Sequence, residues 1–206
     1  MAQAPNNALK TLKMSFEEYL NLDASADFPE GCFEYVDREL RELPPESEPN
    51  NFIARYLMVM LASSGVVSLR LIAIHSCEVE VPVLQPGDAK TRFPDLVILR
   101  PEHLPLTQKR LTITREMPPP LLIAEVVSPG DANRMRDYER KRDQYQALGV
   151  LEYWLIDPEQ QMITLLELQN GSYREVGTFR GQDRITSPNF PDLTLTAQQV
   201  LTPENY

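Results

Sequence analysis

The sequence is poor in the side chains that build disulfide frameworks and soft-metal sites. Its 206 residues include only two cysteines, Cys32 and Cys77, and two histidines, His75 and His103. Two cysteines make neither a disulfide framework nor a metal-binding knuckle, and neither histidine has a partner at ligand spacing. We therefore expect reduced thiols, as in a cytoplasmic protein, and histidines that are structural or surface residues.

Long apolar runs are also missing. No stretch approaches the roughly 18–20 consecutive apolar residues that a membrane helix needs, and the longest runs, at 56–62 and 121–127, suit a protein core. Residues 1–13 lack the apolar segment of a signal peptide and show no periodicity. We expect no membrane partner, a mobile N-terminal arm over 1–13, and one domain over 14–206 that is long enough to bury a core.

Basic residues are fewer than acidic residues. Twenty Lys and Arg against thirty Asp and Glu give a net charge of −10. This balance argues against a surface that coats nucleic acid, because such surfaces are usually basic. It does not exclude an enzyme that acts on nucleic acid through a local basic patch and a metal ion.

The patterns that are present predict an α/β domain with a mixed central sheet, flanking helices and additional antiparallel hairpins. Ser15 and Glu18 form a capping box for a short helix over 14–20, and Asp37-Arg38 and Asn170-Gly171 are predicted hairpin turns. A strand, a helix and a strand over 121–157 imply a parallel pair with a right-handed crossover. We expect helices at 50–63, 133–148 and 197–201. Asn50 or Asn51 is the expected N-cap of the first, after a segment closed by Pro44, Pro45 and Pro49. Strands are expected at 32–36, 39–43, 66–76, 77–83, 93–100, 121–128, 150–157, 162–169 and 172–179, and an extended piece at 190–195.

Glu125 interrupts the apolar run 121–127. A carboxylate that is buried without a partner is costly, so such a group is normally paired, bound to a metal or shifted in pKa. Glu125 is therefore either half of a structural ion pair, with Arg134 or Lys141, or part of an active site.

Lys141 lies on the apolar face of the predicted helix. Tyr138, Lys141, Tyr145 and Leu148 are spaced three, four and three residues apart and so share one side. The alternatives are a lysine whose stem packs while its ammonium reaches water, or an intrahelical pair with Asp137.

Asp95 follows Pro94 at the start of a short apolar strand. Alone it is a routine turn residue. Together, Asp95, Glu125 and Lys141 form a set suited to metal-assisted phosphodiester hydrolysis. Two carboxylates can hold Mg²⁺ or Mn²⁺, the metal ion activates a water, and the lysine orients that water or stabilises developing negative charge.

The sequence resembles the Uma-type family of restriction endonucleases, a branch of the PD-(D/E)xK nuclease superfamily. Four segments carry the resemblance: Glu34 to Glu39 (EYVDRE), Arg92 to Leu96 (RFPDL), Ala124 to Pro129 (AEVVSP), and Asp137 to Lys141 (DYERK) with the continuation GVLEYWLIDP at 149–158. The resemblance implies that Asp95 and Glu125 are metal ligands and that Glu34 adds a further carboxylate. It also implies that Lys141 replaces the lysine usually found at the position of Val127.

Two departures accompany the resemblance. Family members often have a histidine at the opening of the helix that begins here near Asn50, and a glycine in place of Arg38. The resemblance implies a nucleic-acid substrate, DNA first, and cutting both strands of a duplex favours a homodimer, although the sequence shows no interface motif.

Other functions stay open at this level. The same fold can be catalytically inactive and bind nucleic acid or protein, or hydrolyse a smaller phosphodiester. The cationic set of the helix, Arg134, Arg136, Arg140 and Arg142, fits either contact with a phosphate backbone or a solvated face.

Overall fold

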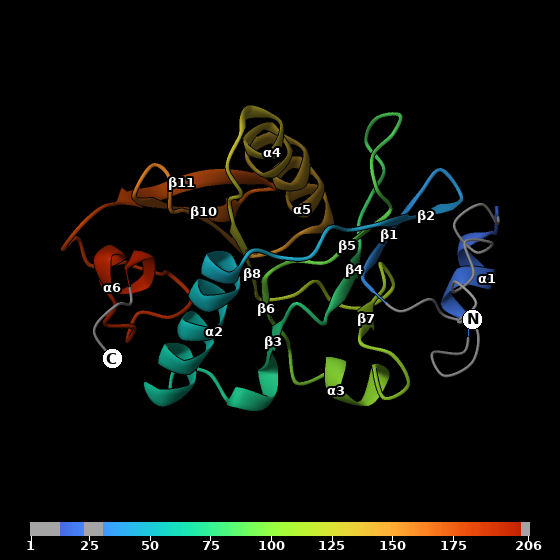
Figure 1. Ribbon diagram of the computed structural model, residues 1–206. Helices are drawn as coiled ribbons and strands as arrows, with labels where there is room; N and C mark the ends of the chain where they lie inside the picture. The colour runs from blue at the N-terminus through green and yellow to red at the C-terminus, as the bar shows by residue number, and fades with distance from the viewer. Residues whose placement is uncertain (1–12, 23–30, 203–206) are drawn as a thin grey trace, which may run out of the picture.

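A six-stranded mixed sheet is the centre of the fold, in the order β11-β10-β9-β8-β6-β3 (Figure 1). The computed structural model describes residues 13–22 and 31–202, so the predicted arm over 1–13 lies outside these ranges except for Lys13. Strands β8 and β9 run parallel, as expected for strands joined by a crossover helix. The strands are β3 (Ile72–Ile74), β6 (Leu96–Ile98), β8 (Leu122–Val126), β9 (Glu152–Asp157), β10 (Met162–Gln169) and β11 (Ser172–Phe179).

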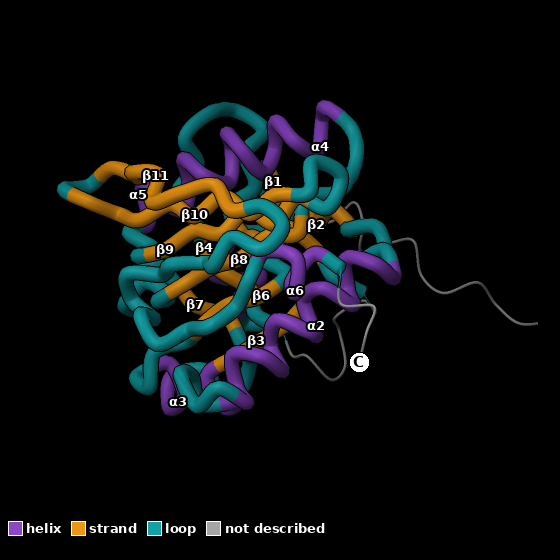
Figure 2. The backbone as a smooth tube through the Cα atoms, turned by 90° about the vertical axis from the view of Figure 1, so that its left-hand side faces the viewer, coloured by secondary structure: helices purple, strands orange, loops and turns teal. Residues whose placement is uncertain are grey.

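Helices cover both faces of this sheet. Helices α2 (Glu48–Ser63) and α6 (Ala197–Leu201) lie side by side on one face (Figure 2). Helices α4 (Asp131–Met135) and α5 (Arg142–Leu148) lie on the opposite face (Figure 1), where Tyr145 shares a core cluster with strand residues such as Ile123. Strand β8 is therefore buried on both sides, which agrees with its nearly continuous apolar sequence.

Smaller elements extend the molecule on one side of the main sheet. Strand β4 (Glu78–Glu80) pairs with β5 (Thr91–Arg92) and β7 (Thr112–Ile113), and β1 (Phe33–Val36) pairs with β2 (Glu39–Glu42). The short elements α1 (Phe16–Leu20), the 3₁₀ turn η2 (Leu69–Leu71) and α3 (His103–Leu106) complete the described chain. The β1–β2 hairpin brings Glu34 toward the main sheet.

Both predicted hairpin turns are confirmed. Asp37 and Arg38 have φ of 49° and 72°, and Asn170 and Gly171 have φ of 51° and 79°. Two consecutive residues with positive φ are the requirement of a type I′ turn, whose twist matches that of the flanking strands. The capping box of α1 is also present in full, between Ser15 and Glu18.

Helix α2 begins earlier than predicted. Its N-cap is Ser47, whose hydroxyl accepts a hydrogen bond from the Asn50 N–H at 3.3 Å, so the prediction of Asn50 or Asn51 as N-cap was wrong. Pro49 does not end the preceding segment but lies in the first helical turn, where a missing N–H is not needed. Asn50 is thereby inside the helix and buried.

The crossover helix contains an irregularity that its sequence pattern does not indicate. It starts at Asp131 rather than at 133, and between α4 and α5 the segment η3 (Arg136–Lys141) is π-helical. A π-helical turn is wider than an α-helical one and is found frequently at functional sites. Gly149 ends the helix with φ of 94°, as expected for a left-handed C′ glycine.

Several predicted strands are shorter than expected. The stretch 66–76 contains the 3₁₀ turn η2 and only a three-residue strand, because His75 has φ of 47° and interrupts the extended backbone. The stretches 77–83 and 93–100 likewise retain three-residue strands, and residues 190–195 carry no strand. Within the described ranges, none of the helices combines the length and apolarity that crossing a membrane requires.

Candidate active site

Strand β8 turns Glu125 toward the layer formed by α4 and α5. Leu122 and Ala124 belong to the core cluster beneath α2, whereas Ile123 belongs to the cluster beneath α5. Alternate residues of a strand share a face, so Glu125 points the same way as Ile123. Only 2% of Glu125 is exposed. The sequence-based prediction of a buried carboxylate is confirmed.

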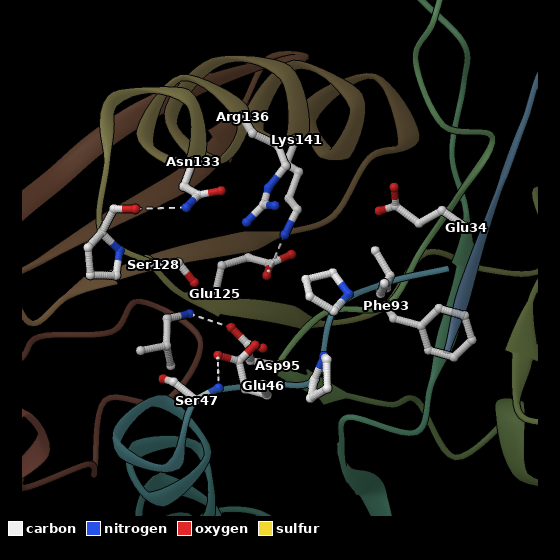
Figure 3. Close-up of a pocket in the computed structure, with 15 residues that line it drawn as sticks. Glu34, Glu46, Ser47, Phe93, Asp95, Glu125, Ser128, Asn133, Arg136 and Lys141 are labelled. Atoms are coloured by element: carbon white, nitrogen blue, oxygen red, sulfur yellow. Dashed lines mark hydrogen bonds and ion pairs between the residues drawn. The ribbon is translucent and has the colours of Figure 1, made fainter. Parts of the chain in front are cut away.

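Asp95 lies beside Glu125 and directly precedes the neighbouring strand β6. The antiparallel register pairs Leu96 with Ala124, and one further step brings Asp95 opposite Glu125. The backbone N–H of Val126 donates to Asp95 Oδ2 at 2.6 Å, which fixes the orientation of the carboxylate. Figure 3 shows both carboxylates in the same pocket.

Lys141 reaches this pair from the helical layer. Its Nζ lies 2.7 Å from Glu125 Oε2 and 3.1 Å from Asp137 Oδ1 (Figure 3). Burial disfavours the charged amine, but the carboxylates of Glu125 and Asp137 outweigh that effect and raise the pKa of Lys141. Lys141 is buried, so the alternative in which its ammonium extends out of the core into bulk solvent is wrong. Both predicted ion-pair alternatives, with Glu125 and with Asp137, are present.

Each oxygen of Glu125 has its own donor. Tyr145 of α5 donates its hydroxyl to Oε1 at 2.7 Å, and Lys141 donates to Oε2. Burial raises the pKa of Glu125 to about 7, helped by Asp95 and Asp137 and opposed by Lys141. Burial also raises the pKa of Tyr145 well above its ordinary value, so this hydroxyl remains a donor. Tyr145 was expected only as a member of the helix face, and its contact with Glu125 depends on the fold.

Glu34 lines the same pocket but is held differently. Its Oε1 accepts a hydrogen bond from Arg92 Nη1 at 3.0 Å, and Arg92 also donates to Gln144 of α5. Arg92 is buried, so this pair anchors the β1–β2 hairpin to the crossover helix. Figure 3 shows the Glu34 side chain set apart from Asp95 and Glu125. Its role as a metal ligand stays a prediction.

His75 is a neighbour of the site that the sequence did not reveal. The register of β3 and β6 pairs Ile74 with Leu96, so the next step brings His75 beside Asp95. His75 Nδ1 lies 3.4 Å from Asp95 Oδ1, and this contact raises the pKa of the imidazole. Spacing along the chain carries no signal of this contact, because it depends on strand order. His103 is structural, with ring nitrogens bonded to the backbone of Arg100 and Pro118.

Asn50 occupies the helix opening where the resemblance leads us to expect a histidine. Its Nδ2 donates to the Val126 carbonyl at 3.4 Å and to Ser128 Oγ at 3.2 Å. These contacts tie the start of α2 to the end of β8, one residue after Glu125. A buried polar group is therefore retained at this position, with a supporting role toward the strand.

Glu34, Asp95, Glu125 and Lys141 line a pocket of about 260 Å³, shown in Figure 3. Exposed residues such as Glu46 and Ser47 form part of its wall, so solvent reaches it. Within the described residues, no group of three or more His, Cys, Asp and Glu side chains is arranged to hold a metal ion. Mg²⁺ does not require such a cage, because it keeps several waters and is usually bound by one or two carboxylates together with phosphate oxygens. The pair Asp95 and Glu125 fits that requirement.

Comparisons with known proteins agree with this fold. Residues 16–198 match the model of the Uma2 family, whose description is "Putative restriction endonuclease". A similar solved structure is that of "a putative nuclease belonging to DUF820" from Anabaena variabilis ATCC 29413, with a TM-score of 0.64 and 17% sequence identity. The match covers 92% of this chain and 98% of the other, and at this identity it establishes the fold alone. No curated protein matches the sequence.

Proposed function

This chain belongs to the Uma2 family, as the resemblance in its sequence predicted, and we propose that it is a metal-dependent endonuclease that hydrolyses nucleic-acid phosphodiester bonds. The observation that carries the proposal is the convergence of the Asp95 and Glu125 carboxylates and the Lys141 ammonium in one solvent-reachable pocket. Three separate elements supply these groups, and two of the three residues are charges in the middle of apolar surroundings. A site of this composition matches the chemistry of phosphodiester hydrolysis.

Asp95 and Glu125 would hold Mg²⁺ or Mn²⁺ through their oxygens. A bound ion of this kind lowers the pKa of a water molecule and neutralises charge on the phosphate. Tyr145 and the Val126 N–H restrict the orientation of the two carboxylates, so that the ligands are held in place before binding. Glu34 is the further acid that we assign to the site by family resemblance.

Lys141 would orient the attacking water or stabilise negative charge that develops on the phosphate. An ammonium has three N–H donors, and Glu125 and Asp137 account for two directions. The third remains for water or a phosphate oxygen. Asp137 holds the lysine from the helix side, so Lys141 keeps one position when Glu125 is engaged by a ligand.

A non-catalytic role in binding nucleic acid or protein is the second candidate. The observation that favours it is that Tyr145 and Lys141 already donate to both oxygens of Glu125, as in a structural pair. Each carboxylate oxygen has a second lone pair, so the contacts do not block a metal ion, and we therefore rank this role second.

The test is cleavage of single- and double-stranded DNA and RNA by the full chain, with Mg²⁺ or Mn²⁺ and with EDTA. We expect metal-dependent cleavage, DNA first, that falls by about 10²–10³ in Asp95→Asn and Lys141→Met. The matched controls, Asp192→Asn and Lys109→Met, change exposed residues outside the pocket and should leave the rate unchanged.

Activity that survives unchanged in both site variants would contradict the assignment. Binding of nucleic acid without cleavage under any of these conditions would favour the second candidate.

A further inference from the structure

The four arginines of the crossover helix have different contacts in the structure, a distinction that the sequence pattern does not make. Arg134 pairs with the buried Asp157, and Arg140 lies 3.5 Å from Asp88. Arg142 lies at the start of α5 and does not line the pocket that contains Glu125. Arg136 alone among the four lines that pocket. Arg136 is therefore the helix arginine that faces the candidate site.

Asp137 fixes the position of Arg136. Arg136 Nε lies 3.0 Å from Asp137 Oδ1, and its Nη2 lies 3.4 Å from Asp137 Oδ2. Asp137 is itself only 1% exposed and also holds Lys141. Among the residues that the structure describes, Arg136 Nη1 has no bonded partner, so the guanidinium is anchored at one side and available at the other.

The unpaired side of the Arg136 guanidinium faces the pocket. Figure 3 shows the Arg136 guanidinium beside Lys141 and above the Glu125 carboxylate. The Arg136 side chain is 37% exposed, whereas that of Lys141 is 8% exposed. Both cations line the pocket, but Lys141 lies deeper and Arg136 lies closer to solvent.

We propose that Arg136 binds a backbone phosphate of the nucleic-acid strand at the mouth of the pocket. The inference rests on the proposed function and names a substrate-binding residue for it. Guanidinium groups suit phosphate because their donors match its oxygens. Ser128 lies on the same pocket and accepts a hydrogen bond from Asn50, so its own hydroxyl proton is available for the same phosphate.

Charge makes this contact important for binding. Asp95, Glu125 and Asp137 outnumber Arg136 and Lys141 in the site, and exposed Glu46 adds a further acid to the wall. The chain as a whole carries a charge of −10. Before a metal ion binds, the acids of the pocket repel a phosphodiester, and Arg136 is the more exposed of the two cations that offset this repulsion.

The experiment measures binding apart from cleavage. Fluorescence anisotropy of fluorescein-labelled DNA oligonucleotides is followed with Ca²⁺ and with EDTA from 50 to 200 mM KCl, and a denaturing gel verifies that the strand stays intact. For Arg136→Gln we expect about tenfold weaker binding and a salt slope of log Kobs reduced by about 0.7 for single strands or 0.9 for duplex, the loss of one phosphate contact. Arg142→Gln, on the same helix outside the pocket, should keep both values.

Two comparisons exclude a merely structural role. Arg136→Lys retains the charge, so it should keep the wild-type salt slope while binding less tightly than arginine. A structural pair with Asp137 would instead lower the melting temperature of Arg136→Gln and leave the salt slope unchanged, which would overturn the inference.

The outcomes also separate the two proposals. Wild-type cleavage with an unaltered salt slope and Kd in Arg136→Gln overturns the Arg136 inference and leaves the nuclease proposal standing. A wild-type chain that neither binds nor cuts any of the nucleic acids overturns both.

Discussion

Lys141 Nζ lies 2.7 Å from Glu125 Oε2, and both side chains are nearly inaccessible to water. Removing one partner of a buried ion pair leaves an uncompensated charge, which typically costs about 3–5 kcal/mol. We expect Lys141→Met to lower the free energy of unfolding by an amount in this range. Adding Glu125→Gln to Lys141→Met should recover part of the lost stability, because it removes the carboxylate that has lost its partner. Urea unfolding of the two single variants and the double variant measures the coupling, and strictly additive losses would contradict a direct pair.

The pKa of Glu125 leads to a prediction about stability and pH. Burial raises it to about 7 in the folded state from an ordinary value of 4.5. The protonated form is favoured by folding, so the contribution of this group to stability is complete below about pH 4.5 and is lost as the pH rises through 7. Glu125→Gln has no carboxylate to ionise, so its stability relative to wild type should improve as the pH rises from 5 to 8. Urea unfolding in EDTA at several pH values checks this, and a difference that is constant with pH would disprove it.

The same raised pKa predicts how a divalent cation competes with a proton. A carboxylate must be ionised to bind a metal ion, so binding should release a proton and strengthen as the pH rises from 6 to 8. Titration calorimetry with Mn²⁺ in buffers of different ionisation enthalpy measures the protons released. Glu125→Gln should abolish both the proton release and most of the affinity. Binding of equal strength at pH 6 and pH 8 would argue against Glu125 as a ligand.

Tyr145 is predicted to orient Glu125 toward the pocket. Tyr145→Phe removes one buried hydroxyl and should lower the free energy of unfolding by about 1 kcal/mol while weakening Mn²⁺ binding several-fold. Tyr173→Phe is the matched control, because its hydroxyl donates to the Val150 carbonyl at 3.0 Å and touches no site residue. The control should lose similar stability without a change in metal affinity. Equal effects of both variants on metal affinity would remove the special role of Tyr145.

His75 is predicted to hold Asp95 in its orientation. His75→Asn keeps a residue that tolerates positive φ but loses the contact with Asp95 Oδ1. We expect weaker Mn²⁺ binding and about tenfold slower cleavage, with a melting temperature close to that of wild type. His103→Asn should show the reverse pattern, because His103 bonds only to backbone atoms away from the pocket. A loss of stability without a change in metal affinity in His75→Asn would assign it a purely structural role.

Much of the site was predictable because two patterns are strong. A glutamate inside a doubly buried strand and a lysine on an apolar helix face must both point inward, and the structure joins Glu125 to Lys141 as those patterns indicate. The turn chemistry of Asn170-Gly171 and the capping box at Ser15 were equally local and equally reliable.

The remaining features depend on contacts between segments that are distant in sequence. His75 reaches Asp95 only because β3 lies beside β6, and Tyr145 reaches Glu125 only because α5 packs on β8. The prediction of the α2 N-cap was wrong because proline, which often closes a segment, is also tolerated in a first helical turn, where Pro49 lies. The π-helical turn at Arg136–Lys141 leaves no mark in the hydrophobic pattern.

That wide turn has a consequence for changes in the length of the helix. Each residue of an α-helix rotates the chain by about 100°, so the loss of a single residue within Arg136–Lys141 would return this segment to α-helical geometry and rotate α4 relative to α5. Such a deletion would change which side chains of the two parts of the helix share a face, so the contacts that join Asp137 and Lys141 to Glu125 would not all be kept. The arrangement of the candidate site therefore depends on the exact length of this segment.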